Sequence, residues 1–235
     1  MCTNEMMKRA LISFVSALTL AACSHGQPSA PQQPTSLKMA SWNMEHLAEA
    51  DNSGCRPRTE ADYAAMRGYV TRLDADVIAL QEVESKAAAE RVFDPAIYTV
   101  VIEERVGADR RGPCRGRDGL TINAQRTGFA IRKDVPFDRL PDFTDIQVGN
   151  VDLRSGVDLI IHPRGGDPIR LLSVHLKSGC SSGEQNEACS VLMQQVPVVE
   201  RWIDSRAEEG VRFAVLGDFN RRLGMANDRV WAEWD

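Results

Sequence analysis

Residue types that bind metal ions and phosphates stand at the ends of four apolar segments of this 235-residue sequence. Asn43, Glu82 and His175 each end or follow one such segment, and Asp218 and Asn220 follow the fourth. Buried strands rarely finish in carboxylates and amides, and α/β proteins place their sites at strand ends. The pattern therefore predicts that the five residues meet in one site.

The chemistry of such a site follows from its donor atoms. Two carboxylates and two amides are hard oxygen donors, which suit Mg²⁺, Mn²⁺ or Ca²⁺ better than zinc. A divalent cation on a phosphate oxygen neutralises the charge that grows as a nucleophile attacks. Asp218 can orient or deprotonate a water, and His175 can bind the phosphate or protonate the leaving oxygen. The residues favour hydrolysis of a phosphate ester.

Each residue also has an ordinary structural explanation. Asn43 could cap a turn or a helix, and Glu82 could cap the following helix through its dipole. His175 could be a satisfied core histidine, while Asp218 and Asn220 could build an Asx turn. Four such coincidences in this order are much less common than any one of them, which favours the site.

The elements that must position these residues alternate between strands and helices. Helical spacing of apolar residues predicts helices over 60–73, 85–91 and 188–206, with Pro197 kinking the third or starting a second helix. Apolar or alternating runs predict strands over 37–42, 76–80, 98–102, 128–132, 157–161, 169–176 and 211–216. Residues 105–119 are rich in Arg, Gly and Asp and predict an exposed loop. The alternation indicates a mixed α/β domain with sheets inside and helices outside.

The first 36 residues are not expected to belong to the folded domain. Lys8 and Arg9 precede an apolar run that is too short to span a membrane and ends in Leu-Ala-Ala before Cys23. Residues 1–23 resemble a bacterial lipoprotein signal peptide with lipidation at Cys23, and an ordinary cleaved signal stays open. Residues 24–36, rich in Pro, Gln and Ser, indicate a flexible linker. We expect a monomer in the cell envelope, periplasmic or anchored to the outer membrane by lipid, with the domain at 37–235.

Charge and cysteine usage fit an exported enzyme. The formal net charge of −5 argues against a protein held to nucleic acid by a broad basic surface. Of the six cysteines, four lie beyond the leader, which suggests disulfides. Cys180 and Cys189 bracket a short polar loop and are paired first, and Cys55 with Cys114 follows by elimination. Free thiols remain the alternative, and the spacing does not fit a zinc site.

Five segments carry a resemblance to a known superfamily. They are Ser41-Trp42-Asn43, Leu80-Gln81-Glu82-Val83, Arg126-Thr127-Gly128-Phe129-Ala130-Ile131, Ser173-Val174-His175-Leu176-Lys177-Ser178 and Gly217-Asp218-Phe219-Asn220. Their order and spacing resemble the endonuclease/exonuclease/phosphatase superfamily, which has the DNase I-like fold. The resemblance covers most of the chain from Leu37 to Asn220.

The resemblance implies an α/β sandwich of two mixed β-sheets flanked by helices, with the site in a cleft at the sheet ends. It implies that Glu82 is the main ligand of Mg²⁺ (or Mn²⁺ or Ca²⁺), with Asn43 and Asp218 beside it. His175, Asp218 and Asn220 would be catalytic. Arg126, His175 and Asn220 would contact the substrate phosphate, although Arg126 could equally be a surface charge. The loop from Ser178 to Cys189 resembles one in exported bacterial members, which supports the Cys180–Cys189 disulfide.

The chain departs from the family pattern near its end. Family members carry a further Asp-His pair on a last strand, and its histidine is the usual general base. Here no histidine follows Asn220. We therefore expect a chain that stops before its last strands and is poorly active. His46, close to Asn43, is a weak substitute for that base.

The substrate stays open. We favour a metal-dependent nuclease or phosphodiesterase that acts on a phosphate ester such as nucleic acid. A phosphomonoesterase or a sphingomyelinase-like phospholipid hydrolase is the first alternative, and a non-catalytic binding protein or inactive remnant is the second. An arginine-rich loop could hold a polyanion, or could be a solvated loop offset by Glu103, Glu104 and Asp109; its arginines are Arg105, Arg110, Arg111, Arg115 and Arg117.

Overall fold

The computed structural model describes residues 36–105 and 112–234, which form two four-stranded sheets and their flanking helices. The expected signal peptide, Cys23 and nearly all of the linker lie outside the described residues. Lipidation at Cys23 therefore stays a prediction, which mass spectrometry of the mature N-terminus would test. Within the described residues, no helix is both long and apolar enough to cross a membrane.

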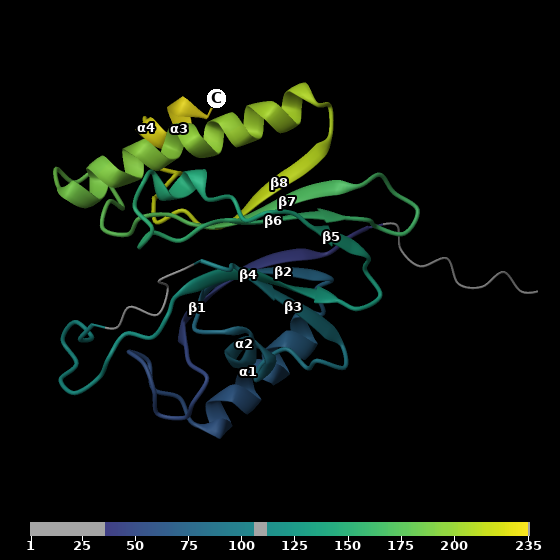
Figure 1. Cartoon of the computed structure of the whole chain (residues 1–235), viewed down its shortest axis with the longest axis vertical. Helices are drawn as coiled ribbons and strands as arrows, with labels where there is room; N and C mark the ends of the chain where they lie inside the picture. The colour runs from purple at the N-terminus through teal and green to yellow at the C-terminus, as the bar shows by residue number, and fades with distance from the viewer. Residues whose placement is uncertain (1–35, 106–111, 235) are drawn as a thin grey trace, which may run out of the picture. The chain divides into compact units, whose positions relative to one another are not determined.

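The first sheet has the order β1-β2-β4-β3 and mixes parallel and antiparallel pairs. Its strands are β1 (Met39–Leu47), β2 (Val77–Val83), β3 (Tyr98–Ile102) and β4 (Arg126–Arg132). The helices α1 (Glu60–Leu73) and α2 (Lys86–Glu90) cover its outer face (Figure 1). Side chains cap both helices, since Asp62 accepts a hydrogen bond from Thr59 N and Ser85 Oγ accepts one from Ala88 N.

The second sheet has the order β5-β6-β7-β8 and is also mixed. Its strands are β5 (Phe137–Arg139), β6 (Val157–Ile161), β7 (Ile169–His175) and β8 (Arg212–Asp218). The long helix α3 (Glu187–Glu208) packs on its outer face beside α4 (Arg229–Glu233) (Figure 1). Asn186 caps α3 by accepting a hydrogen bond from Cys189 N.

Pro197 does not divide α3 into two helices, so the expectation of a second helix is wrong. Proline removes the hydrogen bond to the carbonyl of Met193, but packing holds the helix on both sides of it. Leu192, Val199 and Trp202 are buried against the sheet. Burial of this apolar stripe outweighs the loss of one backbone bond.

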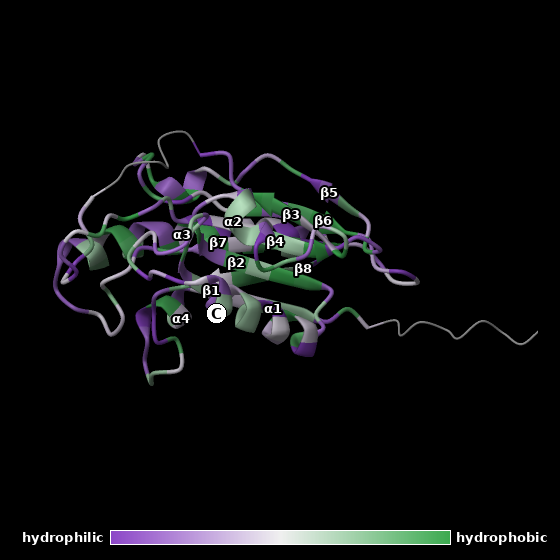
Figure 2. Cartoon of the chain, turned by 90° about the horizontal axis from the view of Figure 1, so that it is seen from below, coloured by the Kyte–Doolittle hydropathy of each residue, from purple (hydrophilic) through white to green (hydrophobic). Residues whose placement is uncertain are grey.

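The two sheets pack face to face through a mostly apolar layer. Phe129 and Ile131 of β4 meet Leu159 of β6 and Leu171 of β7, all without exposed surface. Figure 2 shows that the strands are mostly hydrophobic and the surrounding loops mostly hydrophilic. The predicted sandwich of two mixed sheets flanked by helices is confirmed.

Several sequence expectations need correction. The expected loop over 105–119 does not begin exposed, since the Arg105 side chain is almost fully buried against Glu103. Glu103 is also buried, so the charge of Arg105 that it offsets lies inside the fold and not on a solvated loop. The strand β5 and a short 3-10 helix, Asp145–Gln147, were not predicted, because three residues are too few to show a period.

Candidate metal-dependent active site

Strand irregularities at the ends of β1 and β2 turn the first two predicted residues toward one another. The parallel register of β1 and β2 is regular up to Asn43 opposite Gln81 and then shifts. The antiparallel register of β2 and β4 shifts between Leu80 and Val83. Glu82 lies within this shift and has a φ of 58°. Such a bulge re-aims a side chain, and left-handed backbone outside glycine is a strain typical of functional sites.

On the other sheet, β7 and β8 run parallel and end together with His175 opposite Asp218. The residue before Asp218 must be glycine, because a Cβ on Gly217 would clash with the backbone oxygen of Val174. Asp218 Oδ1 accepts a hydrogen bond from Asn220 N (2.8 Å), and Asn220 Nδ2 donates to the carbonyl of Leu176 (3.0 Å). The turn after β8 is thereby tied to the segment after His175.

Asn43 joins residues of the two sheets. Its Nδ2 donates to Asp218 Oδ2 (2.8 Å) and lies 3.3 Å from Glu82 Oε1. Its Oδ1 accepts a hydrogen bond from Glu45 N (2.9 Å), which fixes the direction of the amide. The two carboxylates that the sequence placed 136 positions apart therefore share one amide nitrogen.

His175 faces the same two carboxylates from inside the fold. Its Nε2 lies 3.8 Å from Glu82 Oε1 and 3.8 Å from Asp218 Oδ2, beyond direct hydrogen-bond distance. Burial, helped by the positive charge of Arg154, lowers the pKa of His175 well below its usual value, so the ring is neutral at pH 7. Its buried Nδ1 has no hydrogen-bond partner among the described residues. This favours the tautomer whose Nε2–H points toward the carboxylates.

A second polar chain, which sequence reasoning missed except for His46, borders Glu82. His46 N donates to Glu82 Oε2 (3.0 Å), and His46 Nε2 lies 3.6 Å from the same oxygen. Gln125 Nε2 lies 3.2 Å from His46 Nε2, and Gln125 Oε1 accepts a hydrogen bond from Arg154 Nη2 (2.6 Å). Gln125 directly precedes β4, and Arg154 lies a short way before β6. A search for polar residues before strands, as well as after them, would have found both.

Arg126 is the first residue of β4, opposite Val83, and is half-buried. Its position beside the Glu82 bulge keeps it close to the site. Its role as a phosphate contact stays a prediction.

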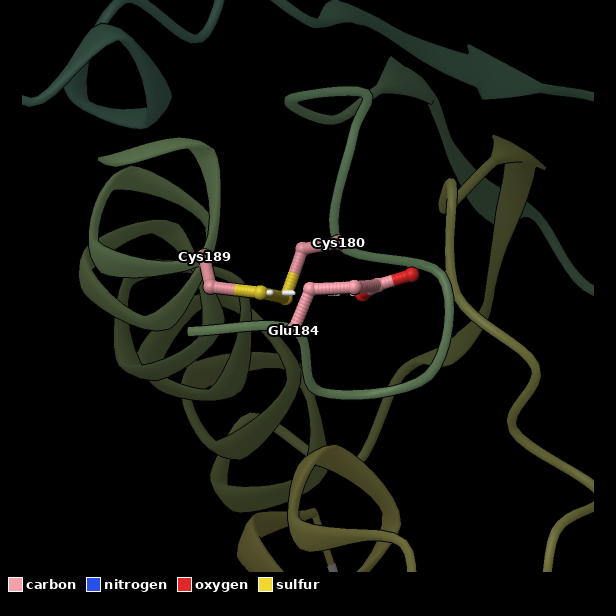
Figure 3. Close-up of side chains that lie close together, drawn as sticks. All are labelled: Cys180, Glu184 and Cys189. Atoms are coloured by element: carbon pink, nitrogen blue, oxygen red, sulfur yellow. Dashed lines mark hydrogen bonds between the residues drawn. A yellow bond between two sulfur atoms is a disulfide. The ribbon is translucent and has the colours of Figure 1, made fainter. Parts of the chain in front are cut away.

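Two disulfides lie in the described residues, Cys55–Cys114 and Cys180–Cys189. Figure 3 shows Cys180, in the loop that precedes α3, joined to Cys189 in the first turn of that helix, with Glu184 beside them. The three side chains approach one another closely, but both sulfurs are bonded to each other, so this cluster is not a thiolate metal site. The loop is fixed to the end of β8, since Arg221 Nη1 donates to the carbonyl of Cys180 (3.0 Å).

Several solved structures have the same fold as this chain. Truncated Caenorhabditis elegans TDP2 matches with a TM-score of 0.56 and 18% identity over 79% of this chain and 63% of that chain. D. rerio TDP2 complexed with a single strand DNA product matches with 0.55 and 20% identity over 84% and 64%. The human Nocturnin catalytic domain with bound sulfate matches with 0.52 and 12% identity over 85% and 69%. The chain thus spans less than two thirds of either TDP2 chain.

Among curated proteins, none matches the chain by sequence. The model of the Endonuclease/Exonuclease/phosphatase family matches residues 40–233, which include both sheets and every residue of the site described above. The chain therefore belongs to the endonuclease/exonuclease/phosphatase family.

Proposed function

We propose that this chain hydrolyses phosphodiester bonds with the help of a divalent cation held by Glu82 and Asp218. The family to which it belongs consists of phosphoester hydrolases, which supports the reaction class. One observation carries the proposal: carboxylates from two different sheets converge on the amide of Asn43 and the ring of His175.

The residues present fit a hard divalent cation. The carboxylates of Glu82 and Asp218 both contact Asn43 Nδ2, so their negative charges repel each other. A cation bound between them would remove that repulsion. Oxygen ligands of this kind suit Mg²⁺, Mn²⁺ or Ca²⁺. In the structure Asn43 offers the carboxylates its nitrogen, so it holds both ligands in place. To offer its oxygen to the cation, as the sequence predicts, its amide must turn over and release Glu45 N.

The bound cation would neutralise charge developing on the phosphate. Asp218 would orient the attacking water, and Asn43 and Asn220 hold the two oxygens of its carboxylate. His175, neutral and with Nε2–H facing the carboxylates, would donate a hydrogen bond to a phosphate oxygen. Asn220 and Arg126 are further candidates for phosphate contact.

A substrate larger than a phosphomonoester has room beside this centre. A cavity of about 510 Å³ adjoins Asn43 and is lined in part by Trp42, Arg56, Arg58 and Arg117. Cationic and aromatic side chains suit the backbone and bases of a nucleic acid. The likeness to a TDP2 bound to a single strand DNA product also supports a nucleic-acid substrate. Cleavage of a phospholipid or a phosphomonoester is the alternative.

The test compares the chain with Glu82→Gln and Asp218→Asn. Substrates are single-stranded DNA, bis-p-nitrophenyl phosphate as a small diester and p-nitrophenyl phosphate as a monoester, each with Mg²⁺, Mn²⁺, Ca²⁺ or chelator. We expect metal-dependent cleavage of the diesters, reduced at least about 10²-fold by either substitution. Glu90→Gln, at the end of α2 and paired with Lys86, is the control and should keep full activity.

The outcomes separate the rival functions. Faster cleavage of the monoester would replace the diesterase proposal with a phosphomonoesterase. Absence of cleavage with every metal, together with unaltered DNA binding by Glu82→Gln, would show a binding protein in place of an enzyme.

A further inference from the structure

Two arginine-bearing loops are joined beside the site by a disulfide. The segments Cys55-Arg56-Pro57-Arg58 and Cys114-Arg115-Gly116-Arg117 have the same order of cysteines and arginines, and their cysteines are bonded to each other. Both cysteines are buried, whereas three of the four arginines are exposed and Arg58 is half-buried. The disulfide therefore brings arginines from two distant parts of the chain close together.

Further bonds hold the two loops in position. Arg117 N donates to the carbonyl of Cys114 (3.2 Å), so Arg117 closes a turn that begins at the disulfide. The buried Asn123 donates from Nδ2 to Ser53 Oγ (3.1 Å), which is a second link between the loops. The arginines thus extend from backbone that is fixed at several points.

A cavity of about 510 Å³ is lined by both loops, the end of β1 and one side of α1. Arg56, Arg58 and Arg117 contribute to its lining together with Asn43, whereas Arg115 does not. Asn43 also contacts both carboxylates of the site. The cavity therefore lies next to the phosphate that would react, and its ligand would be a further part of the same substrate.

The cavity has positive charge that no carboxylate neutralises directly. Its two acidic side chains are already engaged, since Glu45 pairs with Arg56 (2.6 Å) and Asp62 caps α1. Arg58 donates to backbone carbonyls, and neither it nor Arg117 forms an ion pair with any residue that the structure describes. Guanidinium groups in such a position favour an anionic ligand, and phosphate suits their several donors.

The remaining lining favours a nucleotide over other phosphate esters. Half-buried Trp42 and Met66 add aromatic and apolar surface, and Tyr69 supports the Trp42 ring by an edge contact at 5.1 Å. Aromatic rings beside cations suit the bases and backbone of a single strand. The headgroup of sphingomyelin ends in a trimethylammonium group, which the arginines would repel. A phosphomonoester has no second phosphate to place here.

We propose that this cavity binds a second phosphate and its nucleotide in a single-stranded polynucleotide, next to the phosphate that is cleaved. The proposal deepens the proposed function, on which it rests, by naming the substrate class. Arg117 donates hydrogen bonds to the second phosphate, Arg58 adds positive charge, and Trp42 stacks on the base. Polynucleotides therefore gain binding energy that small diesters lack.

The test variant is Arg117→Gln, and Arg115→Gln is its matched control. Both changes remove one positive charge from an exposed position of the same loop, but only Arg117 lines the cavity. Arg117→Lys keeps the charge. Binding of fluorescein-labelled decathymidylate is measured by anisotropy in chelator, over a series of salt concentrations. Cleavage of decathymidylate and of bis-p-nitrophenyl phosphate is measured with Mn²⁺.

We expect Arg117→Gln to raise the Kd for decathymidylate about 10-fold and to lower the slope of log Kd against log salt by about 0.7. Arg115→Gln should change neither quantity, and Arg117→Lys should recover part of the affinity. The ratio of kcat/KM for decathymidylate to kcat/KM for bis-p-nitrophenyl phosphate should fall about 10-fold in Arg117→Gln. The fall should lie in KM, because the cavity is apart from the reacting phosphate.

Several results would overturn this proposal while leaving the proposed hydrolase intact. They are equal decathymidylate binding and cleavage by Arg117→Gln and Arg115→Gln, and absence of decathymidylate binding by the unaltered chain. A third is binding to phosphatidylglycerol vesicles that depends on Arg117 while decathymidylate binding does not, which would assign the cavity to a membrane surface. Arg117-dependent decathymidylate binding without cleavage of any substrate would instead support the cavity and contradict the hydrolase.

Discussion

At the scale of single residues, His175 combines a buried ring with a position between two carboxylates. Burial and the positive charge of Arg154 hold its pKa well below the value of 6.5 that it has when unfolded. The unfolded chain therefore takes up a proton on His175 before the folded chain does. A group with such a lowered pKa contributes stability that is present above pH 6.5 and is lost as the pH falls toward its folded pKa.

We predict that the metal-free chain loses up to about 1.4 kcal/mol of unfolding free energy per pH unit below 6.5 on account of this one group. In His175→Gln this part of the pH dependence should vanish. Urea unfolding at pH 7.5, 6.5 and 5.5 measures it, and His162→Gln, whose exposed ring pairs with Asp138, is the control. Equal pH slopes for His175→Gln and the unaltered chain would contradict a buried, neutral His175.

At the scale of elements, the sequence predicted the strands and helices that have a clear period or an apolar run. Helix α1 and strands β3 and β6 begin and end at the predicted residues. The bulge at Glu82 and the left-handed Asn220 were not predictable, because they depend on pairing with neighbouring strands. The same holds for Arg154. Its position depends on hydrogen bonds that Arg154 and Ser155 form with residues at the end of β3 and the start of β4. The sequence therefore identified site residues that end strands, but it did not identify site residues whose positions depend on tertiary contacts.

The two disulfides close loops of very different length and should stabilise the fold unequally. Cys55–Cys114 spans 59 positions and Cys180–Cys189 spans 9. Loop-closure entropy predicts a loss of about 4 kcal/mol for Cys55→Ala/Cys114→Ala and about 3 kcal/mol for Cys180→Ala/Cys189→Ala. Chemical denaturation of the two double variants under oxidising conditions measures both losses. A larger loss for the shorter loop would mean that contacts of the loop with α3 and Arg221 outweigh chain entropy.

At the scale of the whole described fold, the site is assembled from both sheets. Asn43 and Glu82 come from the first sheet, and His175 and Asp218 from the second. The apolar layer between the sheets, with Phe129 at its centre, sets how these edges meet. The geometry of the site therefore depends on side chains that never touch it.

A cation bound by Glu82 and Asp218 would link the two sheets, so metal binding should stabilise the entire fold. At a metal concentration of 100 times Kd, the unfolding free energy should rise by about 2.7 kcal/mol, because only the folded chain brings both carboxylates together. Thermal unfolding with increasing Mn²⁺, and then with chelator, measures this effect. Glu82→Gln should lose it, and Glu90→Gln, on α2 and away from the site, should keep it. A metal effect of equal size in Glu82→Gln would place the cation elsewhere and remove the basis of the proposed mechanism.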